Sequence, residues 1–142
     1  MTRDSSLEAF CAFYNKLDKT CTNRLAEFYT EDVSFRDPWH HIEGREALIR
    51  YFDTLYTRVG DCRFTFAERL HDGDRAFVRW TLTVTHPALA GGRPVTADGC
   101  SYLRFEAERV REHHDYFDAG ALLYEHVPLL GGAIRYLKRR LA

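Results

Sequence analysis

Apolar residues near the start of the chain recur with the period of an α-helix. They follow an S-x-x-E sequence at residues 5–8, which is typical of a helix start. A shorter second helix is expected over residues 25–29, and a third over residues 47–55, where apolar side chains again gather on one side. The apolar positions of the first helix are Leu7, Phe10, Cys11, Tyr14 and Leu17.

Between the second and third helices the period of the pattern changes to two, which predicts a short strand. Val33, Phe35 and Asp37 fall on one face of this strand. Pro38 ends it, because proline cannot donate a backbone hydrogen bond to a neighbouring strand. Residues 39–44 are expected to form a loop.

Four more segments with a period of two follow, at residues 62–71, 75–86, 95–105 and 110–118. An Asp-Gly pair at residues 72–73 predicts a hairpin between the first two, since it readily adopts the positive φ angles of tight turns. The apolar face of the first segment comprises Cys62, Phe64, Phe66 and Leu70, and that of the second comprises Ala76, Val78, Trp80, Leu82 and Val84.

The order of these elements favours an α+β fold over a parallel α/β sheet, because helices come first and a strand meander follows. We expect one domain over residues 1–142. Its long, bent antiparallel sheet wraps around the N-terminal helices and closes into a cone with an apolar pocket inside.

Residues 119–142 are expected to form a helical tail with an apolar stripe and a basic end. Three interpretations compete: the tail covers the mouth of the cone, packs on a partner subunit, or rests on a membrane surface. The first two are favoured, because the helix is short and has few basic residues. The stripe comprises Leu129, Leu130, Ala133, Ile134, Leu137 and Leu141, and the basic residues are Arg135, Lys138, Arg139 and Arg140.

Composition narrows the class of protein. A hydrophobic fraction of 45% in 142 residues is enough for one core, and a net charge of -1 favours neither nucleic acid nor an anionic membrane. No apolar run is long enough for membrane insertion, and residues 1–5 lack the apolar segment of a signal peptide. The sequence therefore predicts a cytoplasmic protein with reduced cysteines, namely Cys11, Cys21, Cys62 and Cys100.

Asp37 is the first candidate for chemistry. Its strand parity predicts that it points to the covered, apolar side, where a carboxylate is costly to ionise and its pKa should rise. Such a group suits a general acid or base near neutral pH. The alternative is that Asp37 caps the turn at Pro38 or pairs with an arginine.

His113 and Asp115 are the second candidate, because residues two apart on a strand share a face. A histidine beside a carboxylate is a common acid/base arrangement. The alternative is a solvated face shared with Arg109 and Arg111, which have the same parity. Parity leaves open whether Asp115 or Asp118 points inward.

No pattern indicates a metal or a cofactor. The pairs His40–His41 and His113–His114 lack the spacing of metal ligands, and no cysteine partner lies near them. No phosphate-binding or dinucleotide-binding glycine motif occurs either, so we expect neither a metal nor a cofactor.

Two stretches carry a family resemblance. Y-T-E-D-V-S-F-R-D-P at residues 29–38, followed by G-R-E-A-L at 44–48, and the late segment 103–118 resemble the nuclear transport factor 2-like superfamily. This superfamily includes ketosteroid isomerases, SnoaL-type polyketide cyclases and limonene epoxide hydrolases. The resemblance covers residues 5–120 and implies a cystatin-like cone and a homodimer.

The resemblance also implies roles for particular residues. Asp37 falls where the isomerases keep their base, and Asp115 falls where the hydrolase and the cyclases keep an acid/base aspartate. Ser101 falls near the isomerases' protonated aspartate, and Tyr14 lies one position from their oxyanion tyrosine. The Arg-x-Asp pair of the epoxide hydrolases would fall at apolar residues. The complete catalytic set of the hydrolases is therefore absent, and so is that of the isomerases.

We therefore expect a pocket for a small hydrophobic carbonyl or polyketide-type compound. Asp37 or Asp115 would move a proton, assisted by His113, with Tyr14 as a donor to an oxyanion. The alternative is a non-catalytic binding or dimerisation module of the same fold. The residues expected to contact the ligand are Phe35, Tyr51, Trp80, Ser101 and Phe117.

The outer face of the sheet is the expected dimer contact. Arg79, Thr81 and Thr83 fall on the strand face that points away from the cone. Threonine-rich, weakly charged faces can pack against a second copy with two-fold symmetry.

Overall fold

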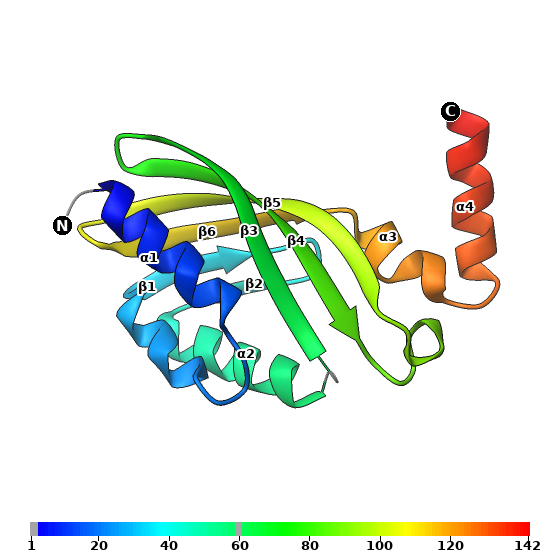
Figure 1. Cartoon of the computed structure of the whole chain (residues 1–142), viewed down its shortest axis with the longest axis horizontal. Coiled ribbons are helices and arrows are strands. Elements are labelled where there is room, and N and C mark those ends of the chain that lie inside the picture. Colours follow the sequence, from blue (N-terminus) through cyan, green and yellow to red (C-terminus); the bar gives the residue numbers. More distant parts are fainter. Residues whose placement is uncertain (1–2, 59–60) are drawn as a thin grey trace.

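The computed structural model describes residues 3–58 and 61–142 and contains one curved sheet with helices on its concave side (Figure 1). The helical elements are α1 (Arg3–Asn15), η1 (Thr22–Glu27), α2 (Arg45–Arg58), η2 (Ala90–Gly92), α3 (Ala119–Leu122), η3 (Tyr124–His126) and α4 (Leu130–Leu141). The strands are β1 (Tyr29–Arg36), β2 (His41–Glu43), β3 (Asp61–Asp72), β4 (Arg75–Thr85), β5 (Val95–Glu106) and β6 (Arg109–Phe117).

The sheet has six strands in the order β2-β1-β6-β5-β4-β3. Strands β3 to β6 form the expected antiparallel meander, whereas β1 pairs with β6 in parallel. The α+β fold class is thus confirmed, with a mixed rather than wholly antiparallel sheet. Strand β2 was not expected, because its three residues lie in the segment predicted as a loop.

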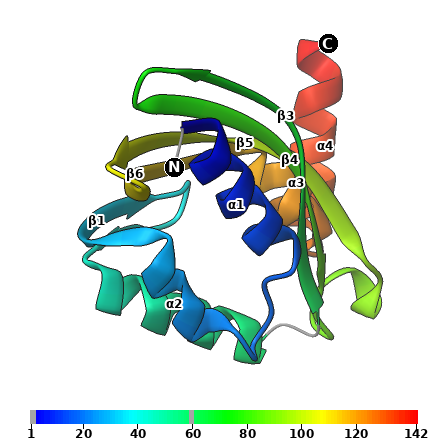
Figure 2. The ribbon, with the colours of Figure 1, turned by 60° about the vertical axis from the view of Figure 1, so that its left-hand side comes forward.

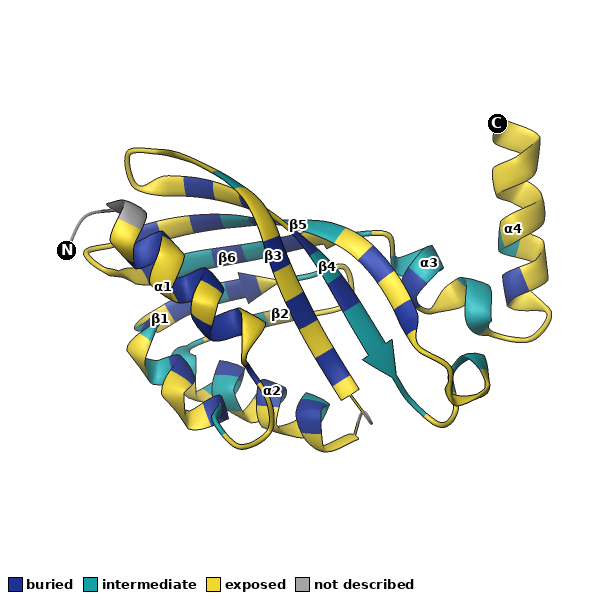
Figure 3. Cartoon of the chain, viewed as in Figure 1, coloured by how far each residue is buried: buried dark blue, intermediate teal, exposed yellow. Residues whose placement is uncertain are grey.

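The core lies between the concave face of the sheet and the helices α1 and α2 (Figure 2). Buried and exposed residues alternate along β3 and β4, as the period of two predicts (Figure 3). Aromatic rings fill the space, and Phe10 of α1 stacks on Phe66 of β3 with 6.3 Å between ring centres. Each such side chain contributes roughly 1.5–3 kcal/mol through burial.

Three local expectations were wrong. The predicted helix over residues 25–29 is the 3-10 turn η1, and Tyr29 already begins β1. The first helix begins at Arg3, two residues before the expected start at Ser5. Leu70 was placed on the inner face of its strand but is 76% exposed, because a register shift between Phe66 and Arg69 reverses the alternation.

The tail does not cover the mouth of the cone. Helix α4 stands away from the sheet (Figure 1), and Leu129 and Leu141 are 95% and 88% exposed. Lys138 ties it to the body through ion pairs of 2.9 Å with Asp118 and Glu125. Within the described ranges, no helix is long and apolar enough to cross a membrane.

Candidate functional site

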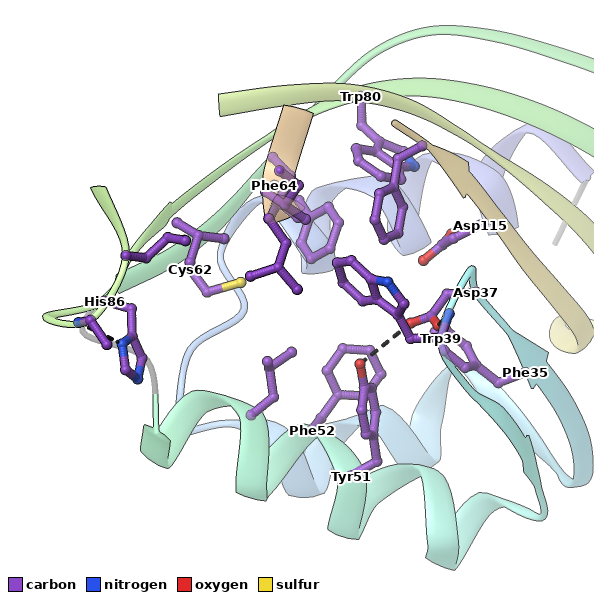
Figure 4. A pocket seen from close by; sticks show the side chains of 18 residues that line it. Phe35, Asp37, Trp39, Tyr51, Phe52, Cys62, Phe64, Trp80, His86 and Asp115 are labelled. Carbon is purple, nitrogen blue, oxygen red and sulfur yellow. Dashed lines mark hydrogen bonds between the residues drawn. The ribbon is translucent and has the colours of Figure 1, made fainter. Parts of the chain in front are cut away.

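A cavity of about 370 Å³ opens between the sheet and α2 (Figure 4). Its wall comes from β1, α2, β3, β4, β6 and α3 and from the loop after β4, and it is mostly apolar. Of the site residues named from the sequence, those that line it are Phe35, Asp37, Tyr51, Trp80, Asp115 and Phe117.

Asp37 lies directly after β1, and its side chain is only 6% exposed. Its Oδ1 accepts hydrogen bonds from the backbone N–H groups of Trp39, at 2.8 Å, and His40, at 2.7 Å. The Tyr51 hydroxyl donates to Oδ2 over 3.4 Å. Asp37 therefore caps the turn, as the second alternative drawn from the sequence expected, and it also borders the cavity.

Asp115 is held through one of its two carboxylate oxygens. The indole N–H of Trp80 donates to Ser101 Oγ over 2.7 Å, and because an indole can only donate, the Ser101 hydroxyl turns its own hydrogen to Asp115 Oδ1. His113 Nε2 lies 2.6 Å from the same oxygen. In the described part of the chain Oδ2 has no hydrogen-bond partner, which leaves this oxygen for the cavity.

Behind His113 the hydrogen bonds continue into the core. Tyr29 Oη lies 2.6 Å from His113 Nδ1, and Tyr14 Oη lies 2.5 Å from Tyr29 Oη. Burial raises the pKa of both tyrosines well above the usual value, so both hydroxyls stay protonated and donate. Every group is satisfied when Tyr14 donates to Tyr29, Tyr29 to Nδ1, and Nε2–H to Asp115.

The structure separates residues that touch the cavity from those behind it. Tyr14, His113 and Ser101 do not line the cavity, although all three were named as site residues. The expected role of Tyr14 as oxyanion donor therefore does not fit this geometry. Tyr51 was expected only to contact the ligand as part of the cavity wall. In the structure its hydroxyl borders the cavity beside Asp37.

A bulge decides the inward face of β6. The register with β5 shifts between Arg104 and Phe105, so Val110 and His113 are both buried although they are three residues apart. Arg111 points outward and pairs with Asp32 at 3.4 Å, which removes the interpretation of a solvated histidine face.

The choice between Asp115 and Asp118 is also settled. Asp115 lines the cavity, whereas the Asp118 side chain accepts a hydrogen bond from the Ala121 N–H at the start of α3. Its second oxygen pairs with Lys138. Both hydrogen bonds lower the pKa of Asp118, and the bond from Lys138 has the larger effect.

Possible metal ligands and thiols are the other reactive side chains of the described residues. No group of three His, Cys, Asp or Glu side chains is placed to hold a metal ion there. The four cysteines are free. Burial raises the pKa of Cys62, which borders the cavity, to about 12, so this thiol is a poor nucleophile.

Comparison with known protein families shows to which family this chain belongs. The SnoaL-like domain matches residues 8–113, which is most of the chain. The protein belongs to the SnoaL-like family. No curated protein matches the sequence. The match to this SnoaL-like domain ends at His113, so Asp115 lies two residues beyond it.

Solved structures share the fold of this SnoaL-like protein at low sequence identity. A hypothetical protein with a ketosteroid isomerase-like fold from Catenulispora acidiphila, in complex with trimethylamine, is 16% identical with a TM-score of 0.73, and the match covers 85% of this chain and 91% of that chain. A candidate SnoaL-like polyketide cyclase from a Jannaschia species is 15% identical, with a TM-score of 0.69 and coverages of 82% and 87%. An LEH-like epoxide hydrolase from M. tuberculosis is 17% identical, with a TM-score of 0.68 and coverages of 83% and 84%. At these identities the likeness establishes the fold.

Proposed function

We propose that this SnoaL-like protein binds a small, largely apolar carbonyl compound in the cavity and moves a proton on it with Asp115. One observation carries the proposal: a carboxylate fixed through Oδ1 by Ser101 and His113 keeps Oδ2 free at an apolar cavity. A base held in one orientation and surrounded by apolar groups is suited to proton transfer.

The proposed step is removal of a proton from the carbon beside the carbonyl. Asp115 Oδ2 takes the proton, the C–H electron pair forms a C=C bond, and the carbonyl oxygen becomes an enolate oxygen. The Tyr51 hydroxyl, which is weakly bonded to Asp37 at 3.4 Å, is the donor available to that oxygen. Asp115 then returns the proton to the same carbon or to another.

The names of the structural neighbours support this class of chemistry without fixing the reaction. A candidate polyketide cyclase and an epoxide hydrolase are among them. Trp80 and Leu82 leave the cavity wall near β4 apolar, which argues against an additional ionic pair there. Asp37, the other carboxylate at the cavity, is the second candidate base.

The test is hydrogen–deuterium exchange of 2-tetralone in D₂O, followed by NMR. The intact protein should accelerate loss of the signals of the protons beside the carbonyl, and Asp115→Asn should reduce that acceleration about 100-fold or more. Asp32→Asn is the matched control, since Asp32 is exposed on β1.

Two other outcomes discriminate between the alternatives. Saturable binding of 2-tetralone without any accelerated exchange would replace the catalytic proposal by a binding module. An equal loss of exchange in Asp37→Asn, with Asp115→Asn unchanged, would move the role of base to Asp37.

A further inference from the structure

One polar side chain of the cavity has no part in the proposed proton transfer. His86 follows β4 by one residue and borders the cavity together with the neighbouring loop residues Ala88 and Leu89. Figure 4 shows it at the end of the cavity opposite Asp37 and Asp115. The side chains drawn between these ends are largely apolar.

The turn after β4 fixes both the backbone and the ring of His86. Its carbonyl oxygen accepts a hydrogen bond from the Leu89 N–H at 2.9 Å. Its ring Nδ1 lies 3.0 Å from the Ala88 N–H, which can only donate. Two bonds within four residues therefore hold the ring in place before any ligand binds.

The bond to Ala88 also determines where the ring hydrogen lies. Nδ1 accepts, so it has a lone pair, and the hydrogen of the neutral ring is on Nε2. Across residues 3–58 and 61–142, nothing forms a hydrogen bond with Nε2. His86, which borders one end of the cavity, thus has an oriented N–H group without a partner among the described residues, and two carboxylates lie at the other end.

We propose that His86 Nε2–H binds a hydrogen-bond acceptor at the far end of the ligand and selects elongated molecules that carry oxygen at both ends. The inference rests on the proposed function, since it requires that the cavity receives a ligand. It adds a substrate class: an apolar body, a carbonyl with an acidic neighbouring C–H at the carboxylate end, and a carbonyl, ether or hydroxyl oxygen at the His86 end.

The wall between the two ends sets the shape of this ligand. Trp80, Leu82, Val84 and His86 share one face of β4 and its extension and all line the cavity. Six residues of strand extend about 20 Å, so the ends are too far apart for one small ring. The apolar side chains between them offer no partner to a polar group, which would lose its bonds to water there.

Tryptophan fluorescence can report directly on ligand binding at this site. The chain has two tryptophans, and both Trp39 and Trp80 line the cavity. Quenching of their fluorescence therefore measures occupancy. We would titrate the intact protein with 4-acetylbiphenyl and with 4-isopropenylbiphenyl, in which a CH₂ group replaces the carbonyl oxygen.

The wild-type protein should bind the ketone about fivefold more tightly than the alkene, the gain typical of one net hydrogen bond. His86→Phe keeps a ring of similar size but has no N–H, so its preference for the ketone should fall, and any remaining preference is the part due to Tyr51. His86→Gln has an amide donor and should recover part of the preference. His41→Phe is the matched control, because His41 is exposed on β2 and outside the cavity.

A ring ¹⁵N NMR spectrum supplies a readout that does not depend on a probe. His86 should show the neutral tautomer with the hydrogen on Nε2, and a hydrogen on Nδ1 would overturn the inference. Equal binding of the two probes by the wild type, or a ketone preference that is unchanged in His86→Phe, would overturn it while the proposed pocket stands. Binding of neither probe would remove the pocket, and with it both proposals.

Discussion

At the level of single residues, Trp80 has two roles. Its ring forms part of the cavity wall, and its N–H donates a hydrogen bond to Ser101 Oγ. Its place depends on a glycine in the neighbouring strand. Gly99 pairs with Trp80 in the β4–β5 register, and a Cβ atom at Gly99 would overlap the indole ring. The ring thus occupies the space that any other residue at this position would fill.

Gly99→Ala should therefore displace Trp80 and lower the free energy of unfolding by about 1–3 kcal/mol, as overpacking of a core does. Tryptophan fluorescence should shift to longer wavelength as the ring moves. Urea unfolding measures the stability. Gly132→Ala is the control, because a Cβ there meets open space within helix α4 and should be neutral or slightly stabilising. Equal effects of the two substitutions would contradict the prediction.

The buried tyrosines predict a sensitivity to alkali. Burial is the largest cause of the raised pKa of Tyr14, Tyr29, Tyr51 and Tyr56. A raised pKa in the folded state means that the fold binds these protons more tightly than the unfolded chain. Their contribution to stability is therefore complete below the unfolded value near pH 10 and is lost as the pH rises above it.

We expect these four tyrosines to ionise together with unfolding above pH 10. Absorbance at 295 nm and far-ultraviolet circular dichroism, recorded on the same samples, measure the two events. Tyr29→Phe should make the absorbance step at unfolding smaller. Full ionisation of all tyrosines before any loss of circular dichroism would contradict the expectation.

At the level of elements, the strong alternation of the meander was enough to predict its strands, and Gly73, with a φ of 63°, forms the predicted hairpin turn. The sequence could not reveal the bulges in β3 and β6, because one extra residue inverts the inner face without a characteristic residue type. This is why Leu70 was misplaced. Parity could not choose between Asp115 and Asp118 because Asp118 lies beyond the end of β6, where it caps α3.

Tyr29 was missed as a site residue for a related reason. The apolar residues 25, 28 and 29 fit a helical turn as well as the start of a strand, and only the pairing of β1 with β6 brings Tyr29 to His113. Asp37 and Asp115 could be found, because short-range parity and the family resemblance point to the same positions.

Removal of the tail tests the placement of α4. Because Leu122 and Leu123 of the α3 region line the cavity and α4 does not, deletion of residues 129–142 should leave the affinity for 4-acetylbiphenyl within about twofold. Leu122→Ala should weaken it more, since a buried wall side chain is lost. Loss of binding in the truncated protein would show that the tail closes over the cavity in solution.

For the whole molecule, we propose the homodimer expected from the sequence, formed through the outer face of the sheet. Large side chains lie exposed there: Phe77 packs on Tyr102 with 5.3 Å between ring centres, and Tyr116, 53% exposed, stacks on His114. A contact of this kind would cover these rings with their own copies.

Sedimentation equilibrium at micromolar concentration should show a dimer, and Tyr116→Glu should shift it to monomer, since two like charges would meet across the two-fold axis. Leu141→Glu is the control, because it changes the exposed stripe of α4 and leaves the sheet unaltered. A wild-type monomer would end the proposal, and dissociation by Leu141→Glu alone would place the contact on α4.

The central position of β6 has a consequence for how the protein matures during synthesis. In the described sheet β6 joins β1 to β5, and it is the last strand to leave the ribosome. Until residues 109–117 emerge, β1 and the β3–β5 hairpins have no shared partner, and the contacts that join them span some 80 residues. Such long-range pairing slows folding. A nascent chain that stops short of β6 has neither His113 nor Asp115, so the candidate site and the complete sheet form in the same step.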